Sequence, residues 1–262
     1  MNAITNWIEE SKKFDQVAET YDLYRPSYPD ALINKIIEKT KVDSTSKLLE
    51  IGSGSGKATE LFVEKNLNIH CIEQGPNLVK CGISKFIGTD QVSFECVAFQ
   101  DWKVELNSYD VAFSAQAFHW VPKPQGYKTL AKALKDKGQM MIFWNKYINN
   151  GDEISKELAS ILKENKILWM LNDKEIETYK NRTYDGIYTT DLFEEIEIHE
   201  YPWTKEYTYK EFINFLSTTN SYISLKSEDR HALNTRLLDV FSVNEDKITL
   251  NLLAILFSAR KC

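Results

Sequence analysis

The sequence of 262 residues lacks several signals that mark large classes of proteins. No run approaches the roughly 20 apolar residues of a membrane span, and residues 1–13 contain no apolar core of a secretion signal. The four cysteines form no C-x-x-C pair and have no metal-ligand spacing with the four histidines. These absences argue against a membrane protein, a secreted disulfide framework and a metal site. They favour a reducing cytoplasm.

A surplus of basic residues is also lacking. Lys and Arg number 32 against 38 Asp and Glu, which gives a net charge of −6 and a pI near 5.4. A nucleic-acid groove needs a basic stripe, so we expect no nucleic-acid partner. The sequence has no internal repeat and no linker rich in Pro or Gly. Its 43% hydrophobic and 27% charged residues are typical of a globular chain long enough for one enzyme-sized α/β domain.

What is present is a glycine pattern after a short apolar run. Residues 47–51 read as a buried strand, and glycines follow at alternate positions, Gly52, Gly54 and Gly56, before a helical pattern. A second apolar run ends in Glu73, 21 residues after Gly52. Glycines let the backbone approach a ligand closely, and a carboxylate can accept two hydrogen bonds from a ribose diol. Together these features predict a nucleoside pocket.

The residues in and around the three glycines, here called the glycine bend, indicate which nucleoside-containing ligand the pocket would bind. A dinucleotide site favours G-x-G-x-x-G, but the third glycine position is Lys57, and no P-loop pattern is present. Glu50 adds negative charge at the end of the strand, which disfavours phosphates. The charge suits a cationic ligand such as S-adenosylmethionine, which carries an ammonium and a sulfonium.

The stretch Leu49–Gly56 resembles the first motif of the class I S-adenosylmethionine-dependent methyltransferases. The resemblance implies a doubly wound, mostly parallel, seven-stranded Rossmann-like α/β sheet. It implies S-adenosyl-L-methionine as cofactor and S-adenosyl-L-homocysteine as product. It also implies cofactor-binding roles in the first two strand ends for Glu50, Gly52, Ser53, Gly54, Gly56, Glu73, Gln74 and Asn77, although Asn77 also suits a cap or turn.

Residues 14–29 resemble the N-terminal element of the small-molecule methyltransferases related to trans-aconitate methyltransferase. In that group a Tyr and an Arg of this element fold over the cofactor, which implies such roles for Tyr21 and Arg25. A guanidinium matches the cofactor carboxylate with two parallel hydrogen bonds. The alternatives are an arginine that fixes a turn and a tyrosine in the core.

Residues 109–121 carry a further likeness to the family, a strand followed by a turn at the edge where α/β ligands bind. The resemblance implies that Ser114, Ala115 and Gln116 line the methionine part of the cofactor. His119 is a candidate general base or substrate-orienting group. Trp120 could wall the substrate cleft. The alternative is a structural histidine packed beside a buried tryptophan.

The residues expected to contact the adenine of the cofactor depart from the family pattern. Family members often place an acid just after the third strand, and the aligned residue here is Ala98. We therefore expect the base to be held by the Phe99 backbone N–H, by packing or by Gln100. Asp101 reads as a cap or turn residue.

We expect one methyltransferase domain over residues 1–262. Its predicted parts are an N-terminal helical lid (1–45), a cofactor-binding core (46–146), a substrate-covering insertion (147–205), and C-terminal helices with closing strands (206–262). Within these parts we expect a helix through Leu134 that ends near Gly138, one amphipathic helix over 152–171, and a polar, aromatic stretch over 172–191.

The predicted reaction is in-line methyl transfer to a small-molecule acceptor, with no membrane partner. Two alternatives stay open. One is a protein that binds the nucleoside without catalysis, as a sensor or partner subunit. The other is a methyltransferase that acts on RNA or protein. The sequence predicts neither the acceptor nor the oligomeric state.

Overall fold

The computed structural model describes residues 13–167 and 170–262. The chain forms two compact units, each built from separate segments. Unit 1 comprises Met1–Pro26, Lys146–Ile176 and Pro202–Leu253, and unit 2 comprises Ser27–Asn145, Glu177–Tyr201 and Ala254–Cys262. The first twelve residues of the predicted lid lie outside the described residues.

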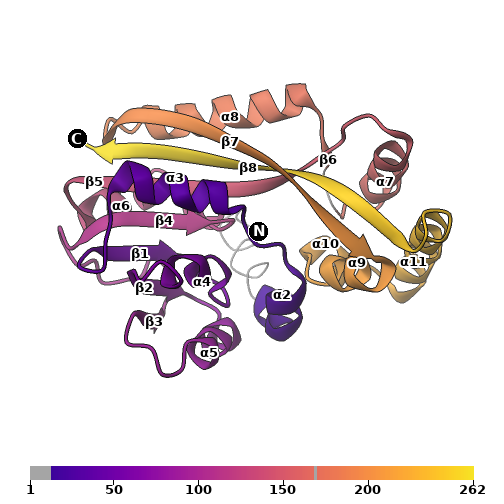
Figure 1. Ribbon diagram of the computed structural model, residues 1–262, viewed down its shortest axis with the longest axis horizontal. Helices are drawn as coiled ribbons and strands as arrows, with labels where there is room; N and C mark the ends of the chain where they lie inside the picture. Colours follow the sequence, from indigo (N-terminus) through magenta and orange to yellow (C-terminus); the bar gives the residue numbers. More distant parts are fainter. Residues whose placement is uncertain (1–12, 168–169) are drawn as a thin grey trace, which may run out of the picture. The chain divides into compact units, whose positions relative to one another are not determined.

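The main sheet has the strand order β3-β2-β1-β4-β5-β8-β7, and a short strand, β6, pairs with β5. From β3 to β5 all neighbours are parallel, whereas Figure 1 draws β7 and β8 in opposite directions. The mostly parallel α/β sheet is therefore confirmed. The strands are β1 (Lys47–Ile51), β2 (Asn68–Glu73), β3 (Val92–Cys96), β4 (Tyr109–Ala115), β5 (Leu134–Ile148), β6 (Met170–Leu171), β7 (Phe193–Thr208) and β8 (Lys247–Lys261).

The strand order reverses beside β1, because β1 pairs with β2 on one side and with β4 on the other. In open α/β sheets ligands bind at such a switch point, outside the carboxyl ends of the strands. The glycine bend after β1 and Glu73 at the end of β2 are placed at this edge.

Unit 2 buries both faces of its sheet, which explains the unbroken apolar run near the end of β5. Phe143 packs edge-on against Tyr28, with ring centroids 4.9 Å apart, and stacks on Phe113 at 6.4 Å. The next residue, Trp144, contacts Phe257 of β8 at 5.9 Å. Alternate residues of a strand point to opposite faces, so a strand covered on both sides is apolar throughout. The helices that hold residues of this unit are α3 (Asp30–Thr40), α4 (Lys57–Val63), α5 (Pro76–Lys85), the 3-10 helix η1 (Phe118–Trp120), α6 (Gln125–Ala133) and α8 (Asp173–Tyr188).

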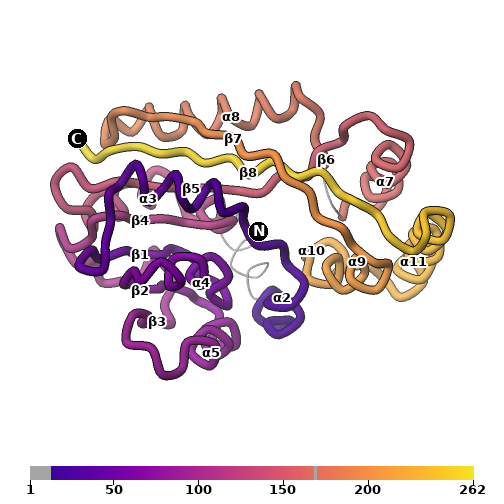
Figure 2. The backbone as a smooth tube through the Cα atoms, in the orientation of Figure 1, coloured from indigo at the N-terminus to yellow at the C-terminus, as the bar shows by residue number. Residues whose placement is uncertain are grey.

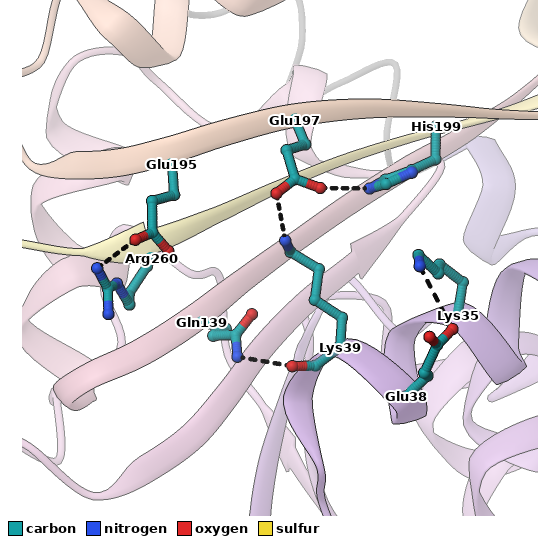
Figure 3. A network of polar contacts seen from close by, with 8 residues as sticks. All are labelled: Lys35, Glu38, Lys39, Gln139, Glu195, Glu197, His199 and Arg260. Atoms are coloured by element: carbon teal, nitrogen blue, oxygen red, sulfur yellow. Dashed lines mark hydrogen bonds and ion pairs between the residues drawn. The ribbon is translucent and has the colours of Figure 1, made fainter.

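Polar contacts connect α3 to strands β5 and β7 (Figure 3). Lys39 Nζ lies 2.7 Å from a Glu197 carboxylate oxygen, and His199 Nε2 lies 3.0 Å from the other. Gln139 donates a hydrogen bond of 3.3 Å to the Lys39 carbonyl. Solvated ion pairs stabilise a fold only slightly, so burial of the apolar face of α3 contributes most to its attachment. The charges on β7, the last strand of the sheet order, disfavour pairing with another chain.

Unit 1 is mainly helical and has a core of its own. Its helix α11 packs against α7 and α9, as the tube in Figure 2 shows, and α2 packs against α9. Helix α9 begins with a capping box, in which Thr208 and Glu211 each accept the other's backbone N–H. The helices are α2 (Ala18–Tyr24), α7 (Glu153–Glu164), α9 (Tyr209–Leu216), α10 (Asn220–Ile223) and α11 (Ser227–Ser242).

The single helix predicted over 152–171 is wrong. Helix α7 ends at Glu164, and Lys166 has a φ of 54°, a left-handed conformation that an α-helix does not contain. Met170 and Leu171 pair with β5 as the strand β6.

Two further boundaries differ from the prediction. The stretch over 172–191 contains a helix, α8, which the sequence interpretation missed. Helix α6 ends at Ala133, not near Gly138, because Leu134 pairs with Tyr109 of β4 and so belongs to the sheet.

Candidate active site

The glycine bend continues β1 in a backbone conformation that requires glycine. The φ angles of Gly52, Gly54 and Gly56 are +69°, +58° and +81°. A Cβ on Gly52 would lie 2.4 Å from the Cβ of Ala117, so the bend also packs closely against the segment after β4. The Gly52 N–H donates to the Ile72 carbonyl at 2.8 Å, which joins the bend to the end of β2. Ser53, within the bend, is buried.

Glu73 lies at the bend, as the sequence spacing required. Its Oε2 accepts a hydrogen bond of 2.9 Å from the Gly54 N–H, and its Oε1 accepts one of 2.8 Å from the Gly75 N–H. The side chain is 9% exposed. A carboxylate has about four acceptor positions, and two backbone donors hold this one in a fixed orientation beside the glycines. Gln74 follows it, partly exposed, and Asn77 lies exposed in the first turn of α5.

Glu50 lies beneath the bend and points into the protein. Its Oε2 accepts a hydrogen bond of 2.5 Å from Thr59 Oγ1 of α4, and Cys71 Sγ lies 3.9 Å away. Burial, with a smaller contribution from repulsion by Glu73, raises the pKa of Glu50 to about 8. The carboxyl group is therefore mostly protonated at pH 7. This differs from the negative charge expected at this position, because burial removes the hydration that ionisation needs.

The end of β4 is connected to both neighbouring strands. Ser114 is buried and donates a hydrogen bond of 2.7 Å to the Ile51 carbonyl of β1. Gln116 has a φ of 57°, and its side-chain oxygen accepts the Asn145 N–H at 3.0 Å. Its amide nitrogen donates to the Asn145 carbonyl at 3.4 Å. Both polar side chains thus fix the strand ends, and the partly exposed Ala115 lies between them.

His119 lies on η1 and is exposed, while the preceding Phe118 is fully buried. The indole N–H of Trp144 donates to His119 Nδ1 at 3.1 Å. The imidazole also packs against Trp120, with ring centroids 4.8 Å apart. His119 is thus held between two tryptophans.

The segment after β3 returns to Glu73 through the backbone, since the Val97 N–H donates to the Glu73 carbonyl at 3.0 Å. Ala98 is partly exposed, and Phe99 is buried, stacked on Trp102 at 5.9 Å. The Ala98 carbonyl accepts the Asp101 N–H at 2.8 Å, the turn expected of that residue. The segment after β3 therefore has no carboxylate at position 98.

Comparison with known proteins identifies a methyltransferase domain in the chain. A profile described as a methyltransferase domain matches residues 49–142, which include the bend, Glu73 and η1. An uncharacterised methyltransferase-like protein of Schizosaccharomyces pombe is 23% identical over 95% of this chain and 96% of its own length. The chain contains a methyltransferase domain and is an S-adenosylmethionine-dependent methyltransferase.

Solved structures of methyltransferases share the fold. A protein named as a type II methyltransferase from Anaeromyxobacter dehalogenans superposes with a TM-score of 0.64 at 16% identity, over 90% of this chain and 98% of the other. Phosphoethanolamine N-methyltransferase 2 of Haemonchus contortus, solved with phosphomonomethylethanolamine and S-adenosylhomocysteine, has a TM-score of 0.55 at 15% identity. That match covers 100% of this methyltransferase and 60% of the other chain.

S-adenosylmethionine fits the geometry of the bend. The Glu73 carboxylate is oriented by backbone amides beside three glycines whose φ angles are positive. A ribose diol needs such an acceptor, and the absence of glycine side chains lets the ligand approach the backbone. In this methyltransferase Glu73 would hold the ribose, and the ends of β1 and β4 would flank the methionine part.

Tyr21 and Arg25, predicted to cover the cofactor, belong to unit 1. The Arg25 Nε donates to Thr218 Oγ1 and its Nη2 to the Thr218 carbonyl, both at 2.8 Å. The guanidinium carbon lies 5.1 Å from the centre of the Tyr21 ring and 5.6 Å from that of Phe215. Arg25 thus organises its own unit, and contact of either residue with the cofactor stays a prediction.

The sequence interpretation of this methyltransferase missed the groups that orient its predicted residues. Thr59 holds the Glu50 carboxyl, Asn145 pairs with the Gln116 amide, and Trp144 donates to His119. The last two follow from the parallel register, which sets Ala115 beside Phe143 and so brings the next residues of both strands together. Nothing in the sequence marks Thr59.

Over residues 13–167 and 170–262, no helix of this methyltransferase is long and apolar enough to cross a membrane. In the same part of the chain no group of three or more His, Cys, Asp or Glu side chains is arranged to hold a metal ion. All four cysteines are free thiols.

Proposed function

We propose that the enzyme transfers the methyl group of S-adenosylmethionine to a small-molecule acceptor by in-line displacement. The observation that carries the proposal is the Glu73 carboxylate held at 2.9 Å from the Gly54 amide at the switch point of the sheet. When bound there, S-adenosylmethionine supplies a methyl group on a positively charged sulfur. The protein then has to align nucleophile, carbon and sulfur and to exclude water.

A small acceptor is supported by charge. The net charge of −6 gives no electrostatic attraction to RNA. The likeness of residues 14–29 to the trans-aconitate methyltransferase group points the same way. So does the phosphoethanolamine methyltransferase among the structural neighbours, whose substrate is small. We place the enzyme in the cytoplasm, where its four free thiols stay reduced.

The test is mass spectrometry of a cell extract incubated with the enzyme and S-adenosylmethionine that carries a labelled methyl group. The expected result is one labelled small metabolite whose labelling falls sharply when Glu73→Gln replaces the wild type at the same subsaturating concentration of S-adenosylmethionine. Label in protein or RNA instead would overturn the small-molecule assignment. Tight binding of S-adenosylmethionine by calorimetry, with no labelled product from any extract fraction, would favour a protein that binds without catalysis.

A further inference from the structure

We propose that Trp144 fixes His119 as a hydrogen-bond donor, so that His119 orients the methyl acceptor and does not serve as its base. Trp144 is then a positioning residue. The inference rests on the proposed function, and it decides between the two roles that the sequence left open for His119.

The hydrogen bond between these side chains determines where the imidazole carries its proton. Indole nitrogen can only donate, so the 3.1 Å contact from Trp144 Nε1 makes His119 Nδ1 the acceptor. A neutral imidazole has one acceptor nitrogen and one N–H, and the hydrogen must therefore be on Nε2. A proton on Nδ1 would set two N–H groups against each other.

Trp144 is held firmly enough to impose this arrangement. It is 3% exposed, and its ring meets Tyr179 of α8 edge-on at 5.8 Å and Phe257 of β8 edge-on at 5.9 Å. The rings of Tyr179 and Phe257 also contact each other at 6.3 Å. An indole enclosed by two aromatic rings cannot turn without leaving its N–H buried and unsatisfied, which is costly.

The His119 side chain is exposed and lies on a single turn of 3-10 helix, where Trp144 donates to its Nδ1 and the Trp120 ring packs against it. A base needs a lone pair for the incoming proton, and the lone pair of His119 is on Nδ1, where Trp144 binds. The other nitrogen, Nε2, carries hydrogen and can only donate. A methyl acceptor that contacts this N–H would accept its hydrogen bond through a lone pair, and the hydrogen bond would hold the acceptor in line with the methyl group.

The hydrogen bond can be observed without activity or cofactor. In protein labelled with ¹⁵N at Trp and His, a correlation across the N–H···N bond should join Trp144 Nε1 to His119 Nδ1 near neutral pH. Trp144→Phe and His119→Gln should each remove the signal and thereby assign it. Trp102→Phe is the matched control, because Trp102 is also buried and donates its indole N–H, to Glu95 at 3.0 Å. The control should keep the signal. Absence of the correlation in the wild type, or a hydrogen on Nδ1, would overturn the proposal.

The role of the donor is tested with the acceptor found by the labelling experiment. Glutamine offers an amide N–H near the position of Nε2 but cannot act as a base. We expect His119→Ala to lower kcat/KM for the acceptor roughly tenfold, the value of one hydrogen bond, and His119→Gln to restore most of it. Loss of a general base would instead cost about 100-fold or more in both variants alike, and that result would contradict the inference. Equal activity of all three proteins would contradict it as well.

The ¹⁵N correlation experiment needs no substrate. The inference about Trp144 and His119 and the proposed function can therefore fail independently of each other. A correlation without any methylated product would leave the Trp144–His119 pair intact and count against the proposed function alone. Methylated product together with a missing correlation would do the reverse.

Discussion

The charged side chains of unit 1 and those at the glycine bend of unit 2 have different kinds of hydrogen-bond partner. In unit 2 the carboxylate of Glu73 takes backbone N–H groups at an edge where a ligand can bind. In unit 1 Arg25 donates hydrogen bonds to Thr218, and its guanidinium group packs against the rings of Tyr21 and Phe215. From this difference we infer a ligand-binding role for Glu73, which backbone amides orient at the edge of the sheet. We infer a structural role for Arg25, whose partners are side chains and a carbonyl group of its own unit.

The largest effect is expected at Gly52, where both conformation and space exclude a side chain. Gly52→Ala should abolish measurable S-adenosylmethionine binding, because its Cβ would lie 2.4 Å from that of Ala117 at a φ of +69°. Calorimetry checks the binding. Gly88→Ala is the control, since Gly88 has a φ of +85° with nothing within 4 Å of the added Cβ. The control should lose about 1–2 kcal/mol of stability and keep its affinity. Equal effects of both changes would remove the close approach from the explanation.

The buried Glu50 predicts a dependence of stability on pH. Its pKa is raised from 4.5 to about 8, so the folded state binds a proton that the unfolded state releases. Stability should therefore decrease as pH rises from about 4.5 to about 8, by on the order of 5 kcal/mol, and then level off. Glu50→Gln cannot ionise and should lack this decrease. Urea unfolding at pH 5, 6.5 and 8 measures it, with the exposed Glu64→Gln as control. Parallel pH curves for wild type and Glu50→Gln would show that Glu50 is ionised in the folded protein.

Glu73→Gln tests the binding edge itself. The amide keeps one acceptor oxygen but loses the charge and places an NH2 group against a backbone N–H of the bend. Hydrogen bonds to charged groups contribute about 1.5–3 kcal/mol, so the Kd for S-adenosylmethionine should rise roughly 10- to 100-fold. Glu64→Gln makes the same charge change on the surface and should leave the Kd unchanged. Unchanged affinity in Glu73→Gln would place the ribose elsewhere.

The smallest effect is expected in unit 1. Thr218→Val removes the hydroxyl that accepts from Arg25, and should lower the free energy of unfolding by about 1–2 kcal/mol with little change in the Kd for S-adenosylmethionine. Thr219→Val is a close control, because both hydroxyls donate to helix carbonyls but only Thr218 accepts from Arg25. A large loss of affinity specific to Thr218→Val would erase the distinction between the two units and give Arg25 a part in cofactor binding.

The arrangement of Glu73 beside the glycine bend could be predicted because its signals are local. A strand, its glycines and the acid of the next strand lie within residues 47–73, and each has one simple interpretation. The orienting partners could not be predicted in the same way. Thr59 faces Glu50 because α4 folds back over β1, and Trp144 meets His119 only through the register of β4 and β5.

Helix α8 shows why the later part of the chain was harder. Its buried positions, Ile176, Thr183 and Ile187, follow helical spacing, but with Tyr179 the stripe consists partly of Thr and Tyr, which hydropathy ranks as polar. The left-handed Lys166 that ends the preceding segment carries no glycine to mark it. Burial of polar residue types and a strained terminus both arise from tertiary packing, which a single sequence does not display.

Unit 2 includes residues 254–262, and Phe257 from this segment forms one wall around the Trp144 indole. A ribosome has to synthesise more than a hundred further residues after β5 before that wall exists. Until then an aromatic surface in the middle of the sheet stays uncovered, and long-range closure of this kind is slow and prone to aggregation. Assembly of the packing around Trp144, which donates to His119, is therefore among the last events of folding, and a nascent chain that stalls before β8 should depend on chaperones.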